Sequence, residues 1–206
     1  RYQYRIDCIG DDDGIAQYEY RQRQPDGTEV LVEEEQNLWA QTHPDDWTER
    51  RPACGALCVQ MSAWLLKADL LREYGLNRDQ LKVLGGVSIY RDGFRVLPYG
   101  DEGDDWLGLD QRRINVPAAR LGNRQIIGIV ELNQEANQDL IDKTNREGLQ
   151  ENQAYFDLKA LVLGVLQILE RHSLEQRQSV KHQSTPKVEL ETRIKDLEET
   201  IQRITG

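Results

Sequence analysis

Hydrophobic and polar residues alternate along residues 1–33, which is the pattern of half-buried β-strands. One face of this segment takes the side chains of Tyr2, Tyr4, Ile6 and Cys8. Residues 10–14 and 25–27, between the alternating runs, are rich in turn-forming Gly, Asp and Pro. The pattern therefore predicts a three-stranded meander that ends at Glu33.

Three later segments also have the pattern of strands. Apolar residues alternate with polar or small ones over residues 56–66. Two short apolar runs, 87–90 and 94–97, flank an Asp-Gly dipeptide at 92–93, which is a strong signal for a β-hairpin. Residues 125–132 are mostly apolar without alternation, as in a strand that is covered on both faces. We expect this last strand to lie in the centre of a sheet.

Helical periodicity is found in three further segments. Residues 68–84 are helical by pattern but are interrupted at Gly75, after which Asn77 can cap a second short helix. Residues 133–143, which begin with a capping Asn, form another predicted helix. The longest helix is predicted over residues 144–171, with an apolar face made of Leu158, Leu161, Val162, Val165, Leu166 and Leu169.

Polar segments separate these elements. Residues 34–53 are predicted as a long loop, which is uncommon inside compact domains unless it has a function. Residues 98–110 form an acidic, Gly-rich loop, and residues 172–186 form a polar linker that ends in Pro. Residues 187–206 carry a short heptad seam of Leu190, Ile194, Leu197, Ile201 and Ile204. We therefore expect an α/β domain over residues 1–171, then a linker and a coiled-coil-like helix.

The composition is that of an acidic globular protein. The 206 residues are 38% hydrophobic and 30% charged, with a formal net charge of −10. This balance argues against general binding to nucleic-acid backbones, because such binding uses Lys and Arg to neutralise phosphates. No apolar run approaches the roughly 18 residues of a membrane span. Since the chain begins at Arg1 without an initiator Met or a leader, we expect a cytoplasmic protein of which this is a fragment.

Few residues offer metal chemistry. Cys54 and Cys58 lack a convincing second pair of zinc ligands, so these thiols and Cys8 are interpreted as small buried side chains. The acidic run at 101–106 does not have the carboxylate spacing of a calcium loop, and a solvated loop is the favoured interpretation. We expect no metal site in the chain.

The most unusual feature is the stretch of residues 143–150. Thr144 and Glu147 have the spacing of a capping box, so Thr144 is predicted to cap the long helix, with Arg146 as its second residue. At that position the guanidinium and the free backbone N–H groups would together suit an anion such as phosphate. The alternative is a surface Arg paired with nearby acidic residues.

The segment Asn145-Arg146-Glu147-Gly148-Leu149-Gln150, which follows the hairpin of residues 86–96, resembles the middle, or transducer, domain of GHKL ATPases. This superfamily includes the ninety-kilodalton heat-shock chaperones, DNA gyrase B, histidine kinases, MutL and the microrchidia proteins. In the chaperones a comparable loop carries an arginine that touches the γ-phosphate of ATP in the neighbouring nucleotide domain. The resemblance covers residues 85–169 and implies this catalytic role for Arg146, with supporting polar roles for Asn145 and Gln150.

The same resemblance implies a fold and a mechanism. The expected fold is that of the second domain of a small-subunit ribosomal protein: a mixed sheet with helices on one face and a left-handed βαβ crossover, contrary to the usual rule. ATP and Mg²⁺ would bind in an N-terminal nucleotide domain of the same protein, and hydrolysis would be coupled to domain movement. The parent protein is expected to be a dimeric ATPase, while this chain alone binds no nucleotide.

The nucleotide-binding boxes of that superfamily are absent from the chain. The segment Asp12-Asp13-Gly14 is superficially similar to the one that reads adenine, but a strand pattern follows it without a glycine-rich lid. A hairpin turn explains these residues better. A P-loop motif is also lacking.

Two other functions remain open. The chain can serve as a non-catalytic interaction module that presents its coiled-coil tail to a partner. It can also bind nucleic acid through the basic side chains of Arg112, Arg113, Arg120 and Arg124, although the acidic balance weighs against this.

Overall fold

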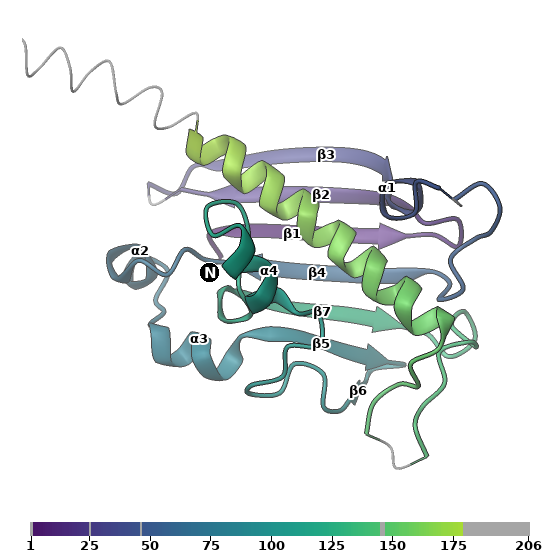
Figure 1. Cartoon of the computed structure of the whole chain (residues 1–206). Helices are drawn as coiled ribbons and strands as arrows, with labels where there is room; N and C mark the ends of the chain where they lie inside the picture. The colour runs from purple at the N-terminus through teal and green to yellow at the C-terminus, as the bar shows by residue number, and fades with distance from the viewer. Residues whose placement is uncertain (1, 25, 46, 145–146, 179–206) are drawn as a thin grey trace, which may run out of the picture. The chain divides into compact units, whose positions relative to one another are not determined.

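The computed structural model describes residues 2–178 except 25, 46, 145 and 146. Its main feature is a seven-stranded sheet of order β3-β2-β1-β4-β7-β5-β6 (Figure 1). The strands are β1 (Tyr4–Gly10), β2 (Ile15–Arg23), β3 (Glu29–Asn37), β4 (Leu57–Ala63), β5 (Gly86–Arg91), β6 (Phe94–Val96) and β7 (Ile126–Leu132). Strands β5 and β7 run parallel, and the other neighbours run antiparallel. The predicted mixed sheet is confirmed, with β7 in its interior.

The N-terminal meander has the predicted strands. In the turn between β1 and β2, the Asp11 carboxylate accepts hydrogen bonds from the backbone N–H groups of Asp13, at 3.0 Å, and Ile15, at 2.9 Å. Gly14 has a φ of 73°, which an L side chain rarely adopts. These contacts confirm a hairpin turn at the Asp-Asp-Gly segment.

The predicted long loop over residues 34–53 was partly wrong. Strand β3 continues to Asn37, and the short helix α1 (Leu38–Thr42) follows it. The Asn37 side chain caps this helix by accepting a hydrogen bond from the Ala40 N–H at 2.8 Å. Trp39 is buried, and its Nε1 donates to the Arg50 carbonyl at 2.8 Å. The cap at Asn37 and the burial of Trp39 therefore stabilise a short helix in a segment that is otherwise polar.

Helices α2 (Ala68–Glu73) and α3 (Arg78–Leu84) confirm the predicted pair, and Asn77 and Gln80 form a complete capping box at the start of α3. These helices enclose a small second core made of Trp64, Leu71, Tyr74 and Leu81. Helix α4 (Leu109–Asn115) was not predicted. The Asp105 carboxylate accepts from the N–H groups of Leu109 and Asp110 at the start of α4. The acidic loop therefore supplies the side chain that caps the start of α4.

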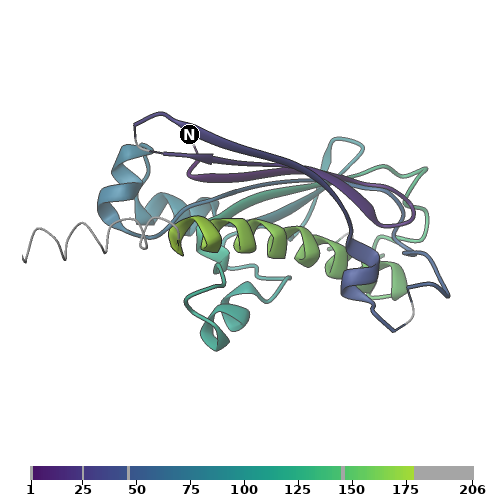
Figure 2. The ribbon, with the colours of Figure 1, turned by 90° about the horizontal axis from the view of Figure 1, so that it is seen from above.

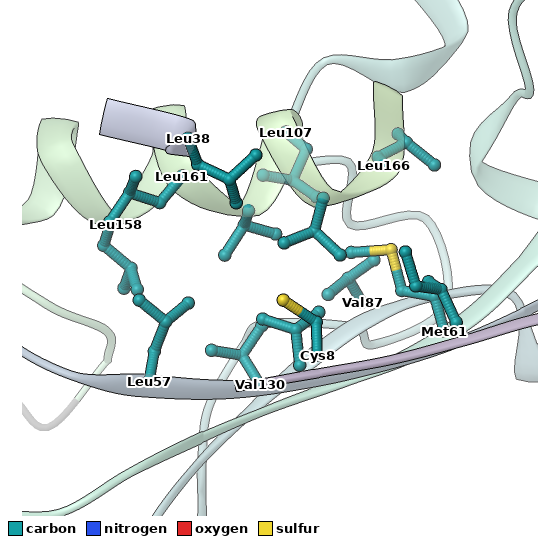
Figure 3. Packing of buried hydrophobic residues seen from close by; sticks show 14 of the residues in the cluster. Cys8, Leu38, Leu57, Met61, Val87, Leu107, Val130, Leu158, Leu161 and Leu166 are labelled. Carbon is teal, nitrogen blue, oxygen red and sulfur yellow. The ribbon is translucent and has the colours of Figure 1, made fainter. Parts of the chain in front are cut away.

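A long helix spans residues 153–178. Its part up to Glu170 crosses one face of the sheet, and α4 lies on the same side (Figures 1 and 2). The predicted apolar face of the long helix is confirmed, because the side chains that line this face are all buried: Leu158, Leu161, Val162, Val165, Leu166 and Leu169. Figure 3 shows Leu158, Leu161 and Leu166 on this helix above Leu57, Met61 and Val130 of the sheet. The main core therefore lies between the long helix and the sheet.

Two predicted helix starts were wrong. Residues 133–143 form turns, because the side chain of Asn137 donates to the carbonyls of Cys54, at 2.6 Å, and Ala56, at 2.7 Å, and ties the segment to the loop before β4. The long helix does not begin at Thr144. Gly148 has a φ of 92°, which is incompatible with a right-handed helix. The Asn152 side chain accepts from the Tyr155 N–H at 3.0 Å and forms the N-cap instead.

The connection from β5 to β7 has the less common hand. After β5 the chain forms β6, passes through α4 on the helix-bearing face and returns to β7, which lies between β5 and β4 (Figures 1 and 2). With both strands pointing the same way, this path is a left-handed crossover, whereas the great majority of such connections are right-handed. The resemblance implied this hand, which composition and periodicity do not predict.

The chain divides into two compact units, Arg1–Glu170 and Arg171–Gly206. The described part of the second unit is helical, so residues 172–178 of the expected linker belong to the long helix. Within it, the Arg177 Nε donates to the Ser173 carbonyl at 2.9 Å. The remaining linker residues and the heptad seam at 187–206 lie outside the described residues.

Candidate functional site

The predicted catalytic segment lies between β7 and the long helix. Asn145 and Arg146 lie outside the described residues, whereas Gln150 is described and exposed. The backbone N–H of Gln150 donates to the Ile141 carbonyl at 2.8 Å, and its side-chain Nε2 donates to the Asp142 carbonyl at 3.4 Å. Gln150 thus closes the base of a loop, and its side chain is engaged with the backbone.

The two sides of this loop are bonded to each other, and residues 140–143 with 148–150 are called the loop stem below. Asp142 and Leu149 form an antiparallel bridge. The Lys143 N–H donates to the Gly148 carbonyl at 2.9 Å. The helix N-terminus predicted at Thr144, with Arg146 as the second residue of the helix, is not formed, because the helix begins at residue 153.

Tyr99 contacts the second side of the stem, residues 148–150. Its hydroxyl accepts a hydrogen bond from the Leu149 N–H at 2.9 Å, and Leu149 is buried. A Cβ on Gly148 would lie only 3.0 Å from the Tyr99 hydroxyl, so the glycine lets the backbone pass over the ring. Burial raises the pKa of Tyr99, which keeps the hydroxyl neutral. Tyr99 also contacts Trp106 edge-on, with ring centroids 5.2 Å apart.

Arg91, at the end of β5, contacts the first side of the stem, residues 140–143. Its Nη1 donates to the Asp142 carboxylate at 2.8 Å and its Nη2 donates to the Leu140 carbonyl at 2.7 Å. The Arg91 side chain is only 12% exposed, whereas the Asp142 side chain is 57% exposed. One guanidinium fork therefore bridges a strand of the sheet and two residues of the stem.

A hollow of about 600 Å³ lies between the stem and the β5–β6 hairpin. Its lining includes Arg91, Phe94, Arg95, Leu97, Gln134 and Asp142. Both arginines already face carboxylates, since Arg95 pairs with Asp101 at 2.8 Å. Phe94 is 80% exposed and Leu97 is 51% exposed. The hairpin thus offers exposed apolar side chains beside charged groups whose positions are fixed by ion pairs.

Of the three cysteines interpreted as small buried side chains, Cys8 and Cys54 are buried and Cys58 is partly exposed. Burial raises the pKa of Cys8 and of Cys54 to about 12, so both thiols are protonated at neutral pH. Within the described part of the chain, no group of three or more His, Cys, Asp and Glu side chains is placed to hold a metal ion. The Asp104 carboxylate accepts instead from the Gly100 N–H at 2.9 Å.

Two of the arginines between 112 and 124 form ion pairs with a buried carboxylate. Glu170, on the long helix, is 3% exposed and accepts hydrogen bonds from Arg112 at 3.2 Å and Arg120 at 2.6 Å. The backbone N–H of Leu121 donates to the same carboxylate at 2.9 Å. Two of the four cations proposed for nucleic-acid contact are therefore committed to a buried carboxylate.

Sequence reasoning missed the residues that build the stem. Tyr99 and Leu149 are 50 residues apart, and Arg91 and Asp142 are 51 apart. Contacts at such separations leave no periodic pattern in a single sequence. The local signal was Gly148, which fits a loop position with positive φ better than the first turn of a helix.

Comparisons with known proteins add no assignment. The chain has no significant match among protein-family models, curated proteins or solved structures. No helix in the described ranges is long and apolar enough to cross a membrane.

Proposed function

We propose that this chain is the transducer domain of a cytoplasmic GHKL ATPase. In this proposal ATP and Mg²⁺ bind in a nucleotide domain elsewhere in the same protein, which acts as a homodimer. Arg146 reaches the γ-phosphate and stabilises the charge that develops as the phosphoryl group is transferred. Asn145 and Gln150 give polar support to that loop.

The observation that carries the proposal is the left-handed crossover, together with the place of the catalytic segment relative to it. The hand is uncommon in general and is the one implied by the resemblance. The loop stem follows β7 and lies beside the end of its parallel neighbour β5, where Arg91 contacts it. The described base of the loop is thus bonded to the sheet, which supports a role in positioning a phosphate ligand.

Substitution of Arg146 in the ATPase that contains this domain tests the proposal. Arg146→Ala should lower kcat by about tenfold to a thousandfold, because it removes charge stabilisation that forms mainly in the transition state. Arg146→Lys should give an intermediate rate, since lysine keeps the charge but loses the bidentate fork. Arg124→Ala is the matched control and should hydrolyse ATP normally. Wild-type turnover in Arg146→Ala would contradict the phosphate role.

The 206-residue chain alone should not bind the nucleotide, because the adenine and Mg²⁺ boxes are absent from its sequence. A melting curve in millimolar Mg-ATP should match the curve without it. A ligand that binds the folded state stabilises it by RT ln(1 + [L]/Kd), so a reproducible upward shift would contradict the domain assignment.

A non-catalytic interaction module with a coiled-coil tail is the second candidate. The observation that favours it is the exposure of Phe94 and Leu97 on the hairpin, because exposed apolar side chains on one element are typical of contact surfaces. This alternative expects normal turnover in Arg146→Ala and loss of a partner in Phe94→Ser. The two candidates therefore differ in which of the two substitutions has an effect.

A further inference from the structure

The sheet holds Arg91 in a fixed position. Arg91 is opposite Leu132 in the parallel register of β5 and β7, and the next residue, Asp92, donates its backbone N–H to the Leu132 carbonyl at 3.0 Å. The Asp92 carboxylate in turn accepts from the Gln134 N–H at 3.3 Å. The end of β5 is therefore bonded to β7 and to the segment that leads into the loop stem.

Burial of Arg91 costs free energy that an apolar residue would not. Desolvation of a guanidinium is unfavourable unless its donors are satisfied. Two of its nitrogens meet Asp142 and Leu140, but its buried Nε has no hydrogen-bond partner among the described residues. A charged side chain retained at such a cost is better explained by the geometry that it imposes than by its net contribution to stability.

The geometry that Arg91 imposes concerns the first side of the stem, and Tyr99 fixes the second side. Arg91 binds Asp142 and Leu140, while Tyr99 binds Leu149. The bridge between Asp142 and Leu149 joins the two sides. Without Arg91, the first side would keep the burial of Leu140 and its bonds to the second side, but it would lose both hydrogen bonds to the end of β5.

We infer that Arg91 is a positioning residue that clamps the loop stem to the end of β5. This inference rests on the proposed function where it concerns ATP turnover, but the clamp itself is a property of the chain. Arg91 contacts the stem and is assigned no contact with nucleotide.

Amide hydrogen exchange of the 206-residue chain tests the clamp without any nucleotide. The probes are the N–H groups of Lys143 and Gln150, whose hydrogen bonds close the stem. Arg91→Gln should speed their exchange by about tenfold, as expected for the loss of charge-assisted hydrogen bonds from a locally opening unit. Arg91→Lys should fall between, because an ammonium group cannot satisfy both acceptors in fork geometry.

Arg51→Gln is the matched control, since Arg51 forms an exposed ion pair with Asp13 far along the sequence from the stem. It should leave the Lys143 and Gln150 amides unchanged. The amide of Val130, in the buried centre of β7, reports global opening and should not change in Arg91→Gln. Unchanged exchange at the stem, or equal acceleration at Val130, would overturn the clamp.

The functional arm uses the ATPase that contains this domain. If Arg91 positions the loop, Arg91→Gln should lower kcat several-fold and leave KM for ATP unchanged, because the substrate site lies elsewhere. Full turnover in Arg91→Gln, alongside a defective Arg146→Ala, would overturn the positioning role while leaving the phosphate role intact. Full turnover in Arg146→Ala would instead defeat the proposed function, whatever the exchange data show for the clamp.

Discussion

At the scale of single residues, the stability of the α/β unit depends on polar side chains that are completely buried. Asp157, on the long helix, is 0% exposed and accepts two hydrogen bonds from Arg50, at 2.7 and 3.2 Å. The Ala53 N–H and the Gln153 side chain donate to the same carboxylate, each at 2.8 Å. Arg50 also lies over the Trp39 ring, 4.5 Å from its centroid. Asp157 therefore fastens the segment after α1 to the helix.

Replacement of Asp157 by Ala should destabilise the chain by about 3 kcal/mol, because a buried ion pair that loses one partner leaves desolvated donors without acceptors. Denaturation by urea, followed by circular dichroism, measures this change. Asp13→Ala is the control, because its pair with Arg51 joins side chains that are 50% and 75% exposed. The control should cost less than about 1 kcal/mol. Equal losses in both variants would contradict the role given to Asp157.

At the scale of elements, the sequence predicted correctly the caps and turns that depend on residues close together in the chain. The Asn77 cap and the hairpin at residues 92–93 each depend on residues a few positions apart, and both are present. The start of the long helix was misplaced because Thr144 and Glu147 match a capping box, while Gly148 and the contact with Tyr99 bend the chain out of helical geometry. Helix α4 was not predicted, because the residue that caps it, Asp105, lies in a segment that was interpreted as an acidic loop.

Substitution of the two candidate caps distinguishes the predicted helix start from the observed one. Asn152→Ala should destabilise the chain by about 1 kcal/mol, as loss of an N-cap usually does. Its side chain also donates to the Asp139 carbonyl at 2.7 Å, which adds to the expected loss. Thr144→Ala should change the free energy of unfolding by less than about 0.5 kcal/mol, as is usual for a surface substitution. A larger loss at Thr144 than at Asn152, measured by thermal unfolding, would restore the earlier start.

At the scale of the whole molecule, the sequence pattern was sufficient to predict the class of fold. It could not predict the contacts that assemble the candidate site. Alternation in residues 1–33 and the apolar run of β7 predicted a sheet. The ties from Arg91 to Asp142 and from Tyr99 to Leu149 join segments that become neighbours only after the sheet has formed. The oligomeric state belongs to this scale too, because the heptad seam at 187–206 is expected to act between copies of the chain.

Removal of residues 187–206 should leave the melting temperature of the α/β unit nearly unchanged, since its core is formed within Arg1–Glu170. The shortened chain should sediment as a monomer and the complete chain as a dimer, because the seam offers apolar side chains at heptad spacing. Leu197→Lys in the complete chain is a matched control that disrupts the seam without shortening it. Equal masses for the complete and shortened chains in analytical ultracentrifugation would contradict a dimer seam.

The position of β7 has a consequence for how the protein is made. Strands β3, β2, β1 and β4 form one set in space, β5 and β6 form another, and β7 supplies the backbone hydrogen bonds between the two sets. Six strands therefore leave the ribosome before the one that joins them. Until residue 132 has been synthesised, the nascent chain carries two partial sheets whose facing edges, β4 and β5, are unpaired. Such edges are prone to wrong pairings, so the interval before β7 emerges is when this chain most needs protection from aggregation.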